Sequence, residues 1–360
     1  MPSGENQVVD AQASALREAG HDVVVVSQST DQRQQRRTYP LEAAVTVATG
    51  LGPSPEEELR RFRPDVVHVH NLFPSFGRRW LRSWDGPVVA TMHNYRPICP
   101  AATLFRDGGT CRDCPESGST RPAVRHGCYR GSRLATLPVA TGTRFARDPV
   151  LVRADVVTTL SDGMSREYVA AGVPAEKLTV LDNFTTAASS PGPGGDTWIY
   201  AGRTDPSKGL HALVRDWPAG QRLLVAGALD PDRPLPEHPD VDCLGRVDGD
   251  RLRDLMGEAR GLVFPSVWLE GLALVCLEAL SVGTPILTFD DVPAGRSVTE
   301  LGVGLAVARD DVAGGVRRAT DAFPGLRERC THVFAEQFTA RSWVRRAEAV
   351  YAHAMSARGG

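Results

Sequence analysis

Short runs of continuously apolar residues alternate along this chain with longer stretches in which apolar residues recur at helical spacing. Continuous apolar runs are typical of parallel strands covered on both faces, because solvent-facing strands alternate instead. The predicted strands are Asp22–Ser27, Asp65–His70, Pro87–Met92, Asp155–Thr159, Leu178–Leu181, Trp198–Ala201, Arg222–Ala226, Val241–Leu244, Gly261–Phe264 and Pro285–Thr288. The predicted helices between them include Glu5–Ala19, Asp162–Ala171, Asp250–Ala259 and Leu272–Val282. This order predicts an α/β protein with a pair of doubly wound sheets.

A segment rich in Gly, Pro and Ser divides this pattern near the middle of the chain. Clusters of these residues mark loops and linkers. We therefore predict an N-terminal domain over residues 1–183, a linker over residues 184–196 and a C-terminal domain over residues 197–338. A last helix is predicted over residues 339–356, where apolar residues again recur at helical spacing.

The bulk composition narrows the class of protein without identifying a chemistry. A chain of 360 residues with 42% hydrophobic residues is long enough for two cores, and its net charge of −2 disfavours nucleic acid as a partner. No apolar run is long enough for a transmembrane helix, and the first residues lack the basic and apolar regions of a signal peptide. The odd number of cysteines, seven, fits a reducing compartment. We expect a cytoplasmic protein, and the excess of Arg over Lys fits a bacterial gene.

The most informative segment runs from Pro265 to Pro285 and carries two carboxylates, Glu270 and Glu278. They stand eight residues apart around the start of an apolar helix, so both side chains can face one crevice above the strand ends. The free N–H groups of the first helical turn lie between them and suit a phosphate. A diphosphate flanked by two hydroxyl-binding carboxylates describes a nucleotide-sugar. An amphipathic helix with two surface glutamates is the alternative interpretation.

Two cations precede this segment, at the start of the second predicted domain. A predicted strand leads to Gly202, Arg203 follows directly, and Lys208 comes five residues later, before the next helix. Fixed cations at the end of a strand can neutralise a diphosphate leaving group without a metal. Solvated side chains near a turn are the alternative, and the order of these cations and the glutamates favours the functional interpretation.

Taken together and in order, these motifs resemble the retaining GT-B glycosyltransferases, in particular glycosyltransferase family 4 (glycosyl transferases group 1). The resemblance rests on residues 202–209, on the Pro-Ser segment with its E-x7-E spacing, and on further segments at 154–161, 172–174 and 181–183. It implies two Rossmann-like domains that face a cleft, with the last helix crossing back to the first domain. It also implies transfer of a sugar from a nucleoside diphosphate donor to an acceptor hydroxyl, with the anomeric configuration kept. No catalytic metal is expected.

The resemblance assigns roles to individual residues. Arg203 and Lys208 stabilise the departing diphosphate, Glu270 contacts the donor sugar, and Glu278 binds the ribose. His93, directly after a predicted strand of the first domain, contacts the donor sugar and helps to bind the acceptor, a capping histidine being the alternative. The remaining contacts to the donor are assigned to Gly4, Gly202, Arg246, Val247, Gly271, Leu272 and Ala273.

The chain departs from the family at its N-terminus. Pro2–Gln7 resembles the glycine loop that normally follows the first strand, with Gly4 placed so that the backbone approaches the donor phosphate. The chain begins at this loop, so the first N-terminal strand, a central strand of the sheet, is missing from the sequence. We expect the native protein to carry an additional segment of roughly 10–20 residues, about one strand and its lead-in. Mass spectrometry of the protein from its native host tests this, and a native N-terminus at Met1 contradicts it.

Four cysteines, Cys99, Cys111, Cys114 and Cys128, follow one another with the spacing C-x11-C-x2-C-x13-C. A C-x2-C pair in a polar turn is typical of a tetrahedral zinc knuckle, which here would staple the long loop after His93. Four reduced thiols are the alternative, because the flanking spacers are not those of a standard pair of knuckles. We predict a structural zinc site at these four residues.

Residues 121–153 contain seven arginines and one acid, Asp148, which gives a local net charge of +6. Such a segment fits an anionic acceptor or a peripheral contact with the inner face of the membrane. A solvated basic helix is the alternative.

Two other functions fit the same motifs. One is a nucleotide-sugar epimerase on the same fold, and the other is a catalytically inactive nucleotide-sugar-binding protein. The intact charged residues of the predicted donor site argue against the second. The sequence leaves the donor sugar open, and the acceptor can be a glycan, a lipid or a small metabolite. UDP is favoured as the donor nucleotide by its frequency in the family.

Overall fold

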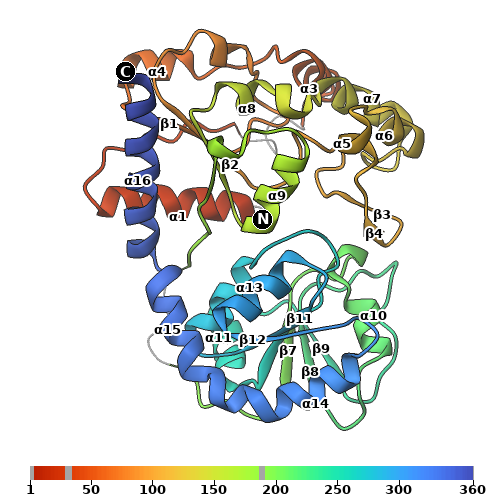
Figure 1. The fold of residues 1–360 in the computed structure, drawn as a ribbon. Coiled ribbons are helices and arrows are strands. Elements are labelled where there is room, and N and C mark those ends of the chain that lie inside the picture. The colour runs from red at the N-terminus through yellow and green to blue at the C-terminus, as the bar shows by residue number, and fades with distance from the viewer. Residues whose placement is uncertain (1–3, 29–34, 186–190, 360) are drawn as a thin grey trace. The chain divides into compact units, whose positions relative to one another are not determined.

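The computed structural model describes residues 4–28, 35–185 and 191–359, and the chain forms two units (Figure 1). Each unit has its own parallel sheet. The first unit holds Met1–Arg106, Cys111–Leu181 and Val344–Gly360, and the second unit holds Asp107–Thr110 and Asp182–Trp343.

The sheet of the first unit has four parallel strands in the order β1-β2-β5-β6. They are β1 (Val67–Val69), β2 (Val88–Met92), β5 (Val156–Thr159) and β6 (Leu178–Val180). Every residue of β2 and β5 is buried, which explains why neither strand alternates between apolar and charged residues. A separate hairpin of two short strands, β3 (Phe105–Arg106) and β4 (Gly109–Thr110), follows β2 in the chain.

The sheet of the second unit has six parallel strands in the order β12-β11-β10-β7-β8-β9. They are β7 (Trp198–Ala201), β8 (Leu223–Ala226), β9 (Val241–Gly245), β10 (Gly261–Phe264), β11 (Ile286–Phe289) and β12 (Gly304–Val307). The chain runs outward from β7 to β9 and then crosses to β10, on the other side of β7. The strand order therefore reverses between β7 and β10, and doubly wound sheets bind their ligands at the carboxyl ends of strands at such a point.

Helices connect the strands in both units. In the first unit they are α1 (Gly4–Glu18), α3 (Tyr39–Thr49), α4 (Glu56–Phe62), α5 (Asp113–Ser117), α6 (Arg121–His126), α7 (Arg133–Gly142), α8 (Pro149–Arg153) and α9 (Asp162–Ala170). In the second unit they are α10 (Leu210–Arg215), α11 (Gly249–Glu258), α12 (Leu274–Ser281), α13 (Pro293–Leu301), α14 (Val312–Ala322) and α15 (Arg327–Gln337). The 3-10 turns are η1 (Arg79–Arg82), η2 (Phe145–Arg147), η3 (Ala175–Lys177), η4 (Pro206–Lys208) and η5 (Phe323–Leu326). In the part of the chain that the structure describes, no helix is both long and apolar enough to cross a membrane.

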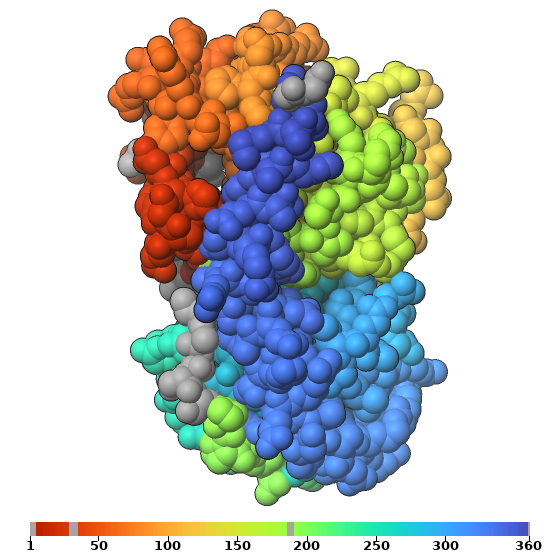
Figure 2. Space-filling model, turned by 60° about the vertical axis from the view of Figure 1, so that its left-hand side comes forward, coloured from red at the N-terminus to blue at the C-terminus, as the bar shows by residue number. Residues whose placement is uncertain are grey.

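The last helix, α16 (Ala340–Gly359), begins in the second unit and continues in the first. Its buried residues Val350 and Ala354 pack against Val89 of β2 and Val156 of β5. On its outer side, His21 Nε2 lies 2.9 Å from Glu348 Oε1, which places the chain after α1 beside α16 (Figure 2). The terminal helix therefore supplies part of the core of the first unit.

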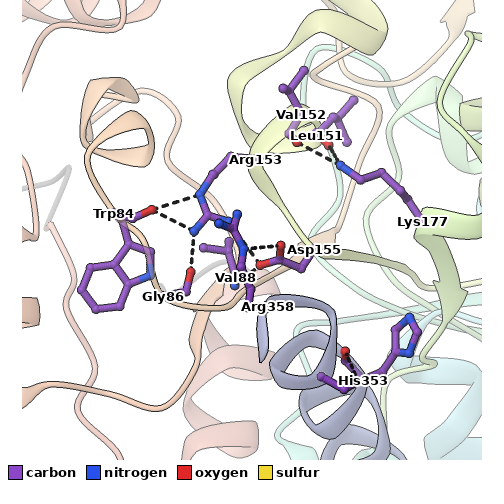
Figure 3. Close-up of polar contacts among 11 residues, drawn as sticks. Trp84, Gly86, Val88, Leu151, Val152, Arg153, Asp155, Lys177, His353 and Arg358 are labelled. Atoms are coloured by element: carbon purple, nitrogen blue, oxygen red, sulfur yellow. Dashed lines mark hydrogen bonds and ion pairs between the residues drawn. The ribbon is translucent and has the colours of Figure 1, made fainter. Parts of the chain in front are cut away.

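A polar network at the start of β2 and β5 fixes the end of α16 (Figure 3). The Asp155 carboxylate accepts hydrogen bonds from the Val88 backbone N–H at 2.8 Å and from Arg358 Nε at 2.8 Å, and it pairs with Arg153 at 3.2 Å. Burial opposes ionisation of this carboxyl, but the Val88 N–H and the Arg358 guanidinium outweigh it and lower the pKa of Asp155. Arg153 also donates to the Trp84 carbonyl at 2.8 Å. One carboxylate thus joins two strands and the last helix.

The structure confirms the α/β class, the parallel sheets and the return of the last helix to the first unit. The prediction of a strand at Asp22–Ser27 is wrong, because these residues pair with no described strand. Val24 and Val25 within this run are 46% and 41% exposed. A parallel strand forms only where a neighbour accepts its hydrogen bonds, and composition alone does not supply one. Three observed strands, β3, β4 and β12, were not predicted.

Replacing Asp155 by Ala should lower the free energy of unfolding of the first unit by about 2–3 kcal/mol, because the Val88 N–H and two arginines lose a largely buried acceptor. Urea unfolding followed by circular dichroism measures this. The matched control is Asp10→Ala, which removes an exposed carboxylate on α1 and should change stability by less than about 0.5 kcal/mol. Equal effects of the two substitutions would contradict the role given to Asp155.

Candidate functional site

The point of strand reversal in the second unit carries two loops that hold most of the predicted donor-site residues. β7 and β10 are neighbours, so their carboxyl ends lie side by side. The loop after β7 contains Arg203 and leads to Lys208 in η4, and the loop after β10 contains Glu270 and leads into α12. The fold therefore brings together at one edge of the sheet residues that are far apart in the sequence.

An ion pair joins the two loops. Lys208 Nζ lies 2.7 Å from Oε1 and 3.0 Å from Oε2 of Glu270, and the two side chains are only 16% and 18% exposed. The Ser266 hydroxyl also donates to Glu270 Oε1. Lys208 Nζ further lies 5.0 Å from the centroid of the Trp268 ring, within the range of a cation–π contact. These contacts fix the position of the Glu270 carboxylate at the end of β10.

Gly209 allows the close approach of these loops. Its φ of 70° lies in the left-handed region, and a Cβ atom at this position would meet the Pro265 carbonyl oxygen at 2.0 Å. Next to it, the Val267 N–H donates to the Ser207 carbonyl at 3.0 Å. Any other residue at 209 would push the loop after β7, which carries Lys208, away from the loop after β10, which carries Glu270.

Arg203 is the exposed cation of the site. Its side chain is 75% exposed, and its only described ion pair is a 3.4 Å contact between Nη1 and Asp205 Oδ2. The backbone is held more firmly than the side chain, since the Tyr200 hydroxyl donates to the Arg203 carbonyl. The guanidinium is therefore free to reach an anion above the end of β7.

The segment that leads into α12 and the helix itself offer unused hydrogen-bonding groups. Within the described residues, the backbone N–H groups of Gly271, Leu272 and Ala273 donate to no acceptor, and the Glu278 carboxylate has no hydrogen-bond partner. Burial raises the pKa of Glu278, and the Arg253 guanidinium partly opposes this. A half-buried carboxylate without a donor can bind a hydroxyl-bearing ligand.

Three predicted donor-site residues lie outside this pair of loops. Arg246 and Val247 follow β9, the edge strand two places away from β7, and Arg246 is exposed. Gly4 is the first residue of α1 in the first unit, and Pro2 and Ser3 of the predicted glycine loop lie outside the described residues. Their predicted contacts to the donor stay predictions.

In the first unit, histidines gather at the carboxyl ends of β1 and β2. His70 follows β1, His93 follows β2, and the Nδ1 of His70 lies 2.9 Å from the Nε2 of His93. His68 stacks near His70 with ring centroids 4.2 Å apart, and it contacts the Tyr351 hydroxyl at 2.9 Å and the Thr91 hydroxyl at 2.7 Å. The sequence pattern singled out His93, but it did not predict the direct hydrogen bond to His70. Because β1 and β2 pair in parallel, their carboxyl ends meet, and this pairing brings His70 and His93 together.

Burial keeps these rings neutral. It lowers the pKa of His68 to about 3, with the neighbouring His93 adding to the effect, and it lowers the pKa of His93 to about 4. The pKa of His70 also lies well below the ordinary value, again through burial first and the two other rings second. At neutral pH the cluster therefore works as a chain of uncharged donors and acceptors.

A small cavity of about 90 Å³ borders this cluster and is lined by His70, His93, Asn94, Arg96 and Phe73 among others. Arg96 lies over the Phe73 ring at 4.3 Å. Glu5, on α1, has a buried carboxylate oxygen without a hydrogen-bond partner among the described residues, and burial raises its pKa. Sequence reasoning missed Glu5 and Arg96, because neither stands next to a recognisable strand end.

The four clustered cysteines lie in one part of the first unit, where Cys114 is buried and the other three are half-buried. The backbone links them, since the Cys128 N–H donates to Ala123, whose own N–H faces the Cys114 thiol. Across the described ranges, however, no three His, Cys, Asp or Glu side chains are arranged to hold a metal ion. The zinc site stays a prediction, which the metal content of the purified protein would test.

Two protein-family models match the chain. The model described as Glycosyltransferase Family 4 matches residues 2–187, and the model described as Glycosyl transferases group 1 matches residues 195–322. Together they cover both units apart from the last helices.

The curated relatives have low sequence identity to this chain, but the matches run over most of its length. A glycogen synthase from Mycobacterium tuberculosis is 26% identical over 276 residues, which cover 71% of this chain and 59% of that enzyme. The chain thus spans less than two thirds of that relative. A phosphatidyl-myo-inositol mannosyltransferase from Mycolicibacterium smegmatis is 24% identical over 345 residues, which cover 87% of this chain and 79% of that enzyme.

Solved structures share the fold over nearly the whole chain. Sucrose-phosphate synthase from Thermosynechococcus elongatus matches with a TM-score of 0.67 at 16% identity. The match covers 99% of this chain and 94% of that protein's chain. Anabaena HepE in complex with UDP-glucose has a TM-score of 0.56 at 14% identity and covers 98% of this chain and 97% of its own. These similarities confirm the GT-B architecture, with two Rossmann-like domains.

The neutral histidines should make the first unit less stable in acid. Below the ordinary histidine pKa of 6.5 the unfolded chain takes up protons, whereas the folded His93 ring does so only near pH 4. The contribution of each neutral ring to the free energy of unfolding is therefore fully present above about pH 6.5. It falls by about 1.4 kcal/mol per pH unit as the pH decreases toward the folded-state pKa. Urea unfolding at a series of pH values should show a shallower fall in His93→Asn between about pH 6 and 4.5.

His126→Asn is the matched control for this measurement. Its ring is exposed on α6 and has no partner among the described residues, so the wild-type slope should be kept. Identical slopes in the wild type and in His93→Asn would contradict a neutral His93 in the folded state.

Proposed function

Because the chain belongs to glycosyltransferase family 4 (glycosyl transferases group 1), we propose that it is a glycosyltransferase that moves a sugar from a UDP-sugar to an acceptor hydroxyl. The acceptor is a glycan, a lipid or a metabolite, and the anomeric configuration of the sugar is retained. The observation that carries the proposal is the arrangement at the carboxyl ends of β7 and β10. There a fixed Lys208–Glu270 pair and an exposed guanidinium at Arg203 share one end of the sheet, and the helix that follows, α12, carries the unpartnered carboxylate of Glu278.

Each of these groups matches one part of a nucleotide-sugar. The unbonded N–H groups of Gly271, Leu272 and Ala273 suit the phosphates, because these residues directly precede α12 and the N-terminal end of a helix attracts an anion. Glu278 suits the ribose, since a carboxylate can accept from two neighbouring hydroxyls. Glu270 retains acceptor capacity beside its contacts to Lys208 and Ser266, and it suits a sugar hydroxyl.

The proposed step is an attack on the face from which the diphosphate departs. The bond between the anomeric carbon and the diphosphate oxygen breaks as the acceptor oxygen forms its bond to that carbon. The acceptor proton passes to a phosphate oxygen of the leaving group, so no side chain acts as a nucleophile. Arg203 and Lys208 compensate the charge that develops on the diphosphate, and the proposal therefore needs no catalytic metal.

The choice of UDP is supported by relatives with the same fold. Anabaena HepE was solved with UDP and with UDP-glucose, and Staphylococcus aureus TarM was solved with UDP. The names of the curated relatives, glycogen synthase and phosphatidyl-myo-inositol mannosyltransferase, cover a glycan and a lipid. Both classes of acceptor therefore stay within the proposal.

Binding of UDP, GDP and ADP to the purified chain should be measured by isothermal titration calorimetry. We expect UDP to bind and Glu278→Ala to weaken it at least about tenfold, because the ribose loses its acceptor. Glu300→Ala, which removes an exposed carboxylate of α13 in the same unit, is the matched control and should bind UDP like the wild type. Preference for GDP or ADP would overturn the choice of UDP, and binding that ignores Glu278 would overturn the site.

The same chain should release or transfer sugar from a UDP-sugar in a coupled assay for UDP. Arg203→Ala should lower kcat by about 100-fold with a smaller effect on KM, since the guanidinium acts on charge that develops in the transition state. Proton NMR of the product should show the anomeric configuration of the donor. An inverted product would contradict the same-face mechanism.

A further inference from the structure

A large cavity of the first unit is lined by arginines. It has a volume of about 800 Å³, and its lining includes five arginines and no Asp or Glu. The wall is assembled from the ends of α3 and α5, from η1, from the turn before α6 and from the segment before α8, and α3, α5, α6 and α7 are neighbours in Figure 1. The arginines are Arg78, Arg79, Arg82, Arg144 and Arg147.

One of these arginines is structural. Arg78 pairs with the buried Asp148 at 2.8 Å and donates to the carbonyls of Val47 at 3.0 Å and Gly142 at 3.2 Å. Asp148 is the acid nearest in sequence to the cavity segment, and it also accepts the Val150 N–H at 2.9 Å. Burial raises the pKa of Asp148, and Arg78 opposes this. The Asp148 carboxylate is thus already paired, chiefly with Arg78.

The other four guanidiniums remain available. Arg79, Arg82, Arg144 and Arg147 are exposed, and in the described chain no carboxylate forms an ion pair with any of them. Four like charges around one cavity repel one another, so the arrangement costs stability unless an anion occupies it. Solvation of the separate side chains reduces that cost without removing it.

Local packing fixes the position of these charges. η1 reads Arg-Trp-Leu-Arg, and its central Trp80 and Leu81 are only 3% and 1% exposed. Because the apolar pair is buried in the core, the flanking Arg79 and Arg82 are directed outward. On the opposite segment, the buried Asp148 and Leu151 anchor the chain that carries Arg144 and Arg147.

We propose that this arginine cavity is a binding site for a phosphate-bearing ligand, held by the guanidinium groups of Arg79, Arg82, Arg144 and Arg147. Guanidinium forks bind phosphate oxygens in pairs and with little loss of side-chain freedom. The cavity exceeds the size of a single phosphate and lies within the range of pockets that enclose whole small molecules. The site uses only residues of the first unit, so the proposal does not rest on the donor site.

Two sources can supply this chemistry: a soluble phosphorylated sugar or the headgroup of an anionic phospholipid. The helices beside the cavity carry exposed apolar residues that only a lipid source would use. Leu41 on α3 is 70% exposed, and Leu134 and Leu137 on α7 are 79% and 46% exposed. Exposed leucines beside cations are typical of surfaces that rest on an anionic membrane.

The test compares the full-length wild type with the variant Arg79→Glu/Arg147→Glu. Glucose 6-phosphate is titrated by calorimetry, and vesicles of phosphatidylcholine with or without phosphatidylglycerol are tested by co-sedimentation. We expect one or both probes to bind the wild type and to bind the variant at least about tenfold more weakly. The matched control, Arg60→Glu/Arg61→Glu on α4, makes the same change of charge in the same unit and should bind like the wild type.

A third variant separates the two sources. Leu134→Ser/Leu137→Ser should lose vesicle binding but keep glucose 6-phosphate binding if the ligand is a lipid headgroup, and it should change neither if the ligand is soluble. UDP binding by Arg79→Glu/Arg147→Glu is measured alongside and should be unchanged, which separates this proposal from the donor site. Equal binding of both probes by the wild type and the cavity variant, or no binding of either probe by the wild type, overturns the proposal.

Discussion

The ion pair between Lys208 and Glu270 is the interaction on which the proposed donor site depends. It joins the loop after β7 to the loop after β10 and so holds the two sides of the strand reversal at a fixed distance. Gly209 permits this contact, since a side chain there would collide with the Pro265 carbonyl. The charged residues of this region differ in how firmly they are held. Lys208 and Glu270 are held in place, whereas Arg203 is exposed and Glu278 has an unused carboxylate.

The polar side chains at the strand ends of the two units differ in charge. In the second unit the side chains at the carboxyl ends of β7 and β10 are charged: Lys208 and Glu270 are largely buried and paired, and Arg203 is exposed. In the first unit the histidines at the equivalent strand ends are buried and neutral, and they hydrogen-bond to one another, to Thr91 and to Tyr351. Under the proposed function, an uncharged network of this kind suits recognition of sugar hydroxyls, while the charged residues of the second unit suit compensation of a diphosphate.

Much of this architecture could be predicted from local sequence patterns, and the exceptions have physical causes. β7 and β10 were predicted with their observed bounds, because four consecutive buried residues leave an unbroken apolar run. β12 was missed because it is a half-buried edge strand with the sequence Gly-Leu-Ala-Val, which lacks β-branched residues at most positions. The E-x7-E spacing located Glu270 and Glu278, but the partner of Glu270 could not be read from it. The contact with Lys208 spans 62 residues and exists only because β7 and β10 are neighbours. The arginine cavity was visible only as a basic composition over 121–153, and two of its available arginines, Arg79 and Arg82, lie outside that segment.

The outer edge of β1 has a consequence for the behaviour of the purified chain. β1 stands at the end of its sheet, and no described strand pairs with its far side. The valines of residues 23–26, which have the composition of a strand, pair with no described strand either, and two of them are exposed, although the Val23 carbonyl accepts a hydrogen bond from Arg17 Nη2 at 2.9 Å. A strand edge without a pairing partner is a template on which a second molecule can add a strand. A strand added to β1 by a second molecule would extend the sheet without unfolding either core.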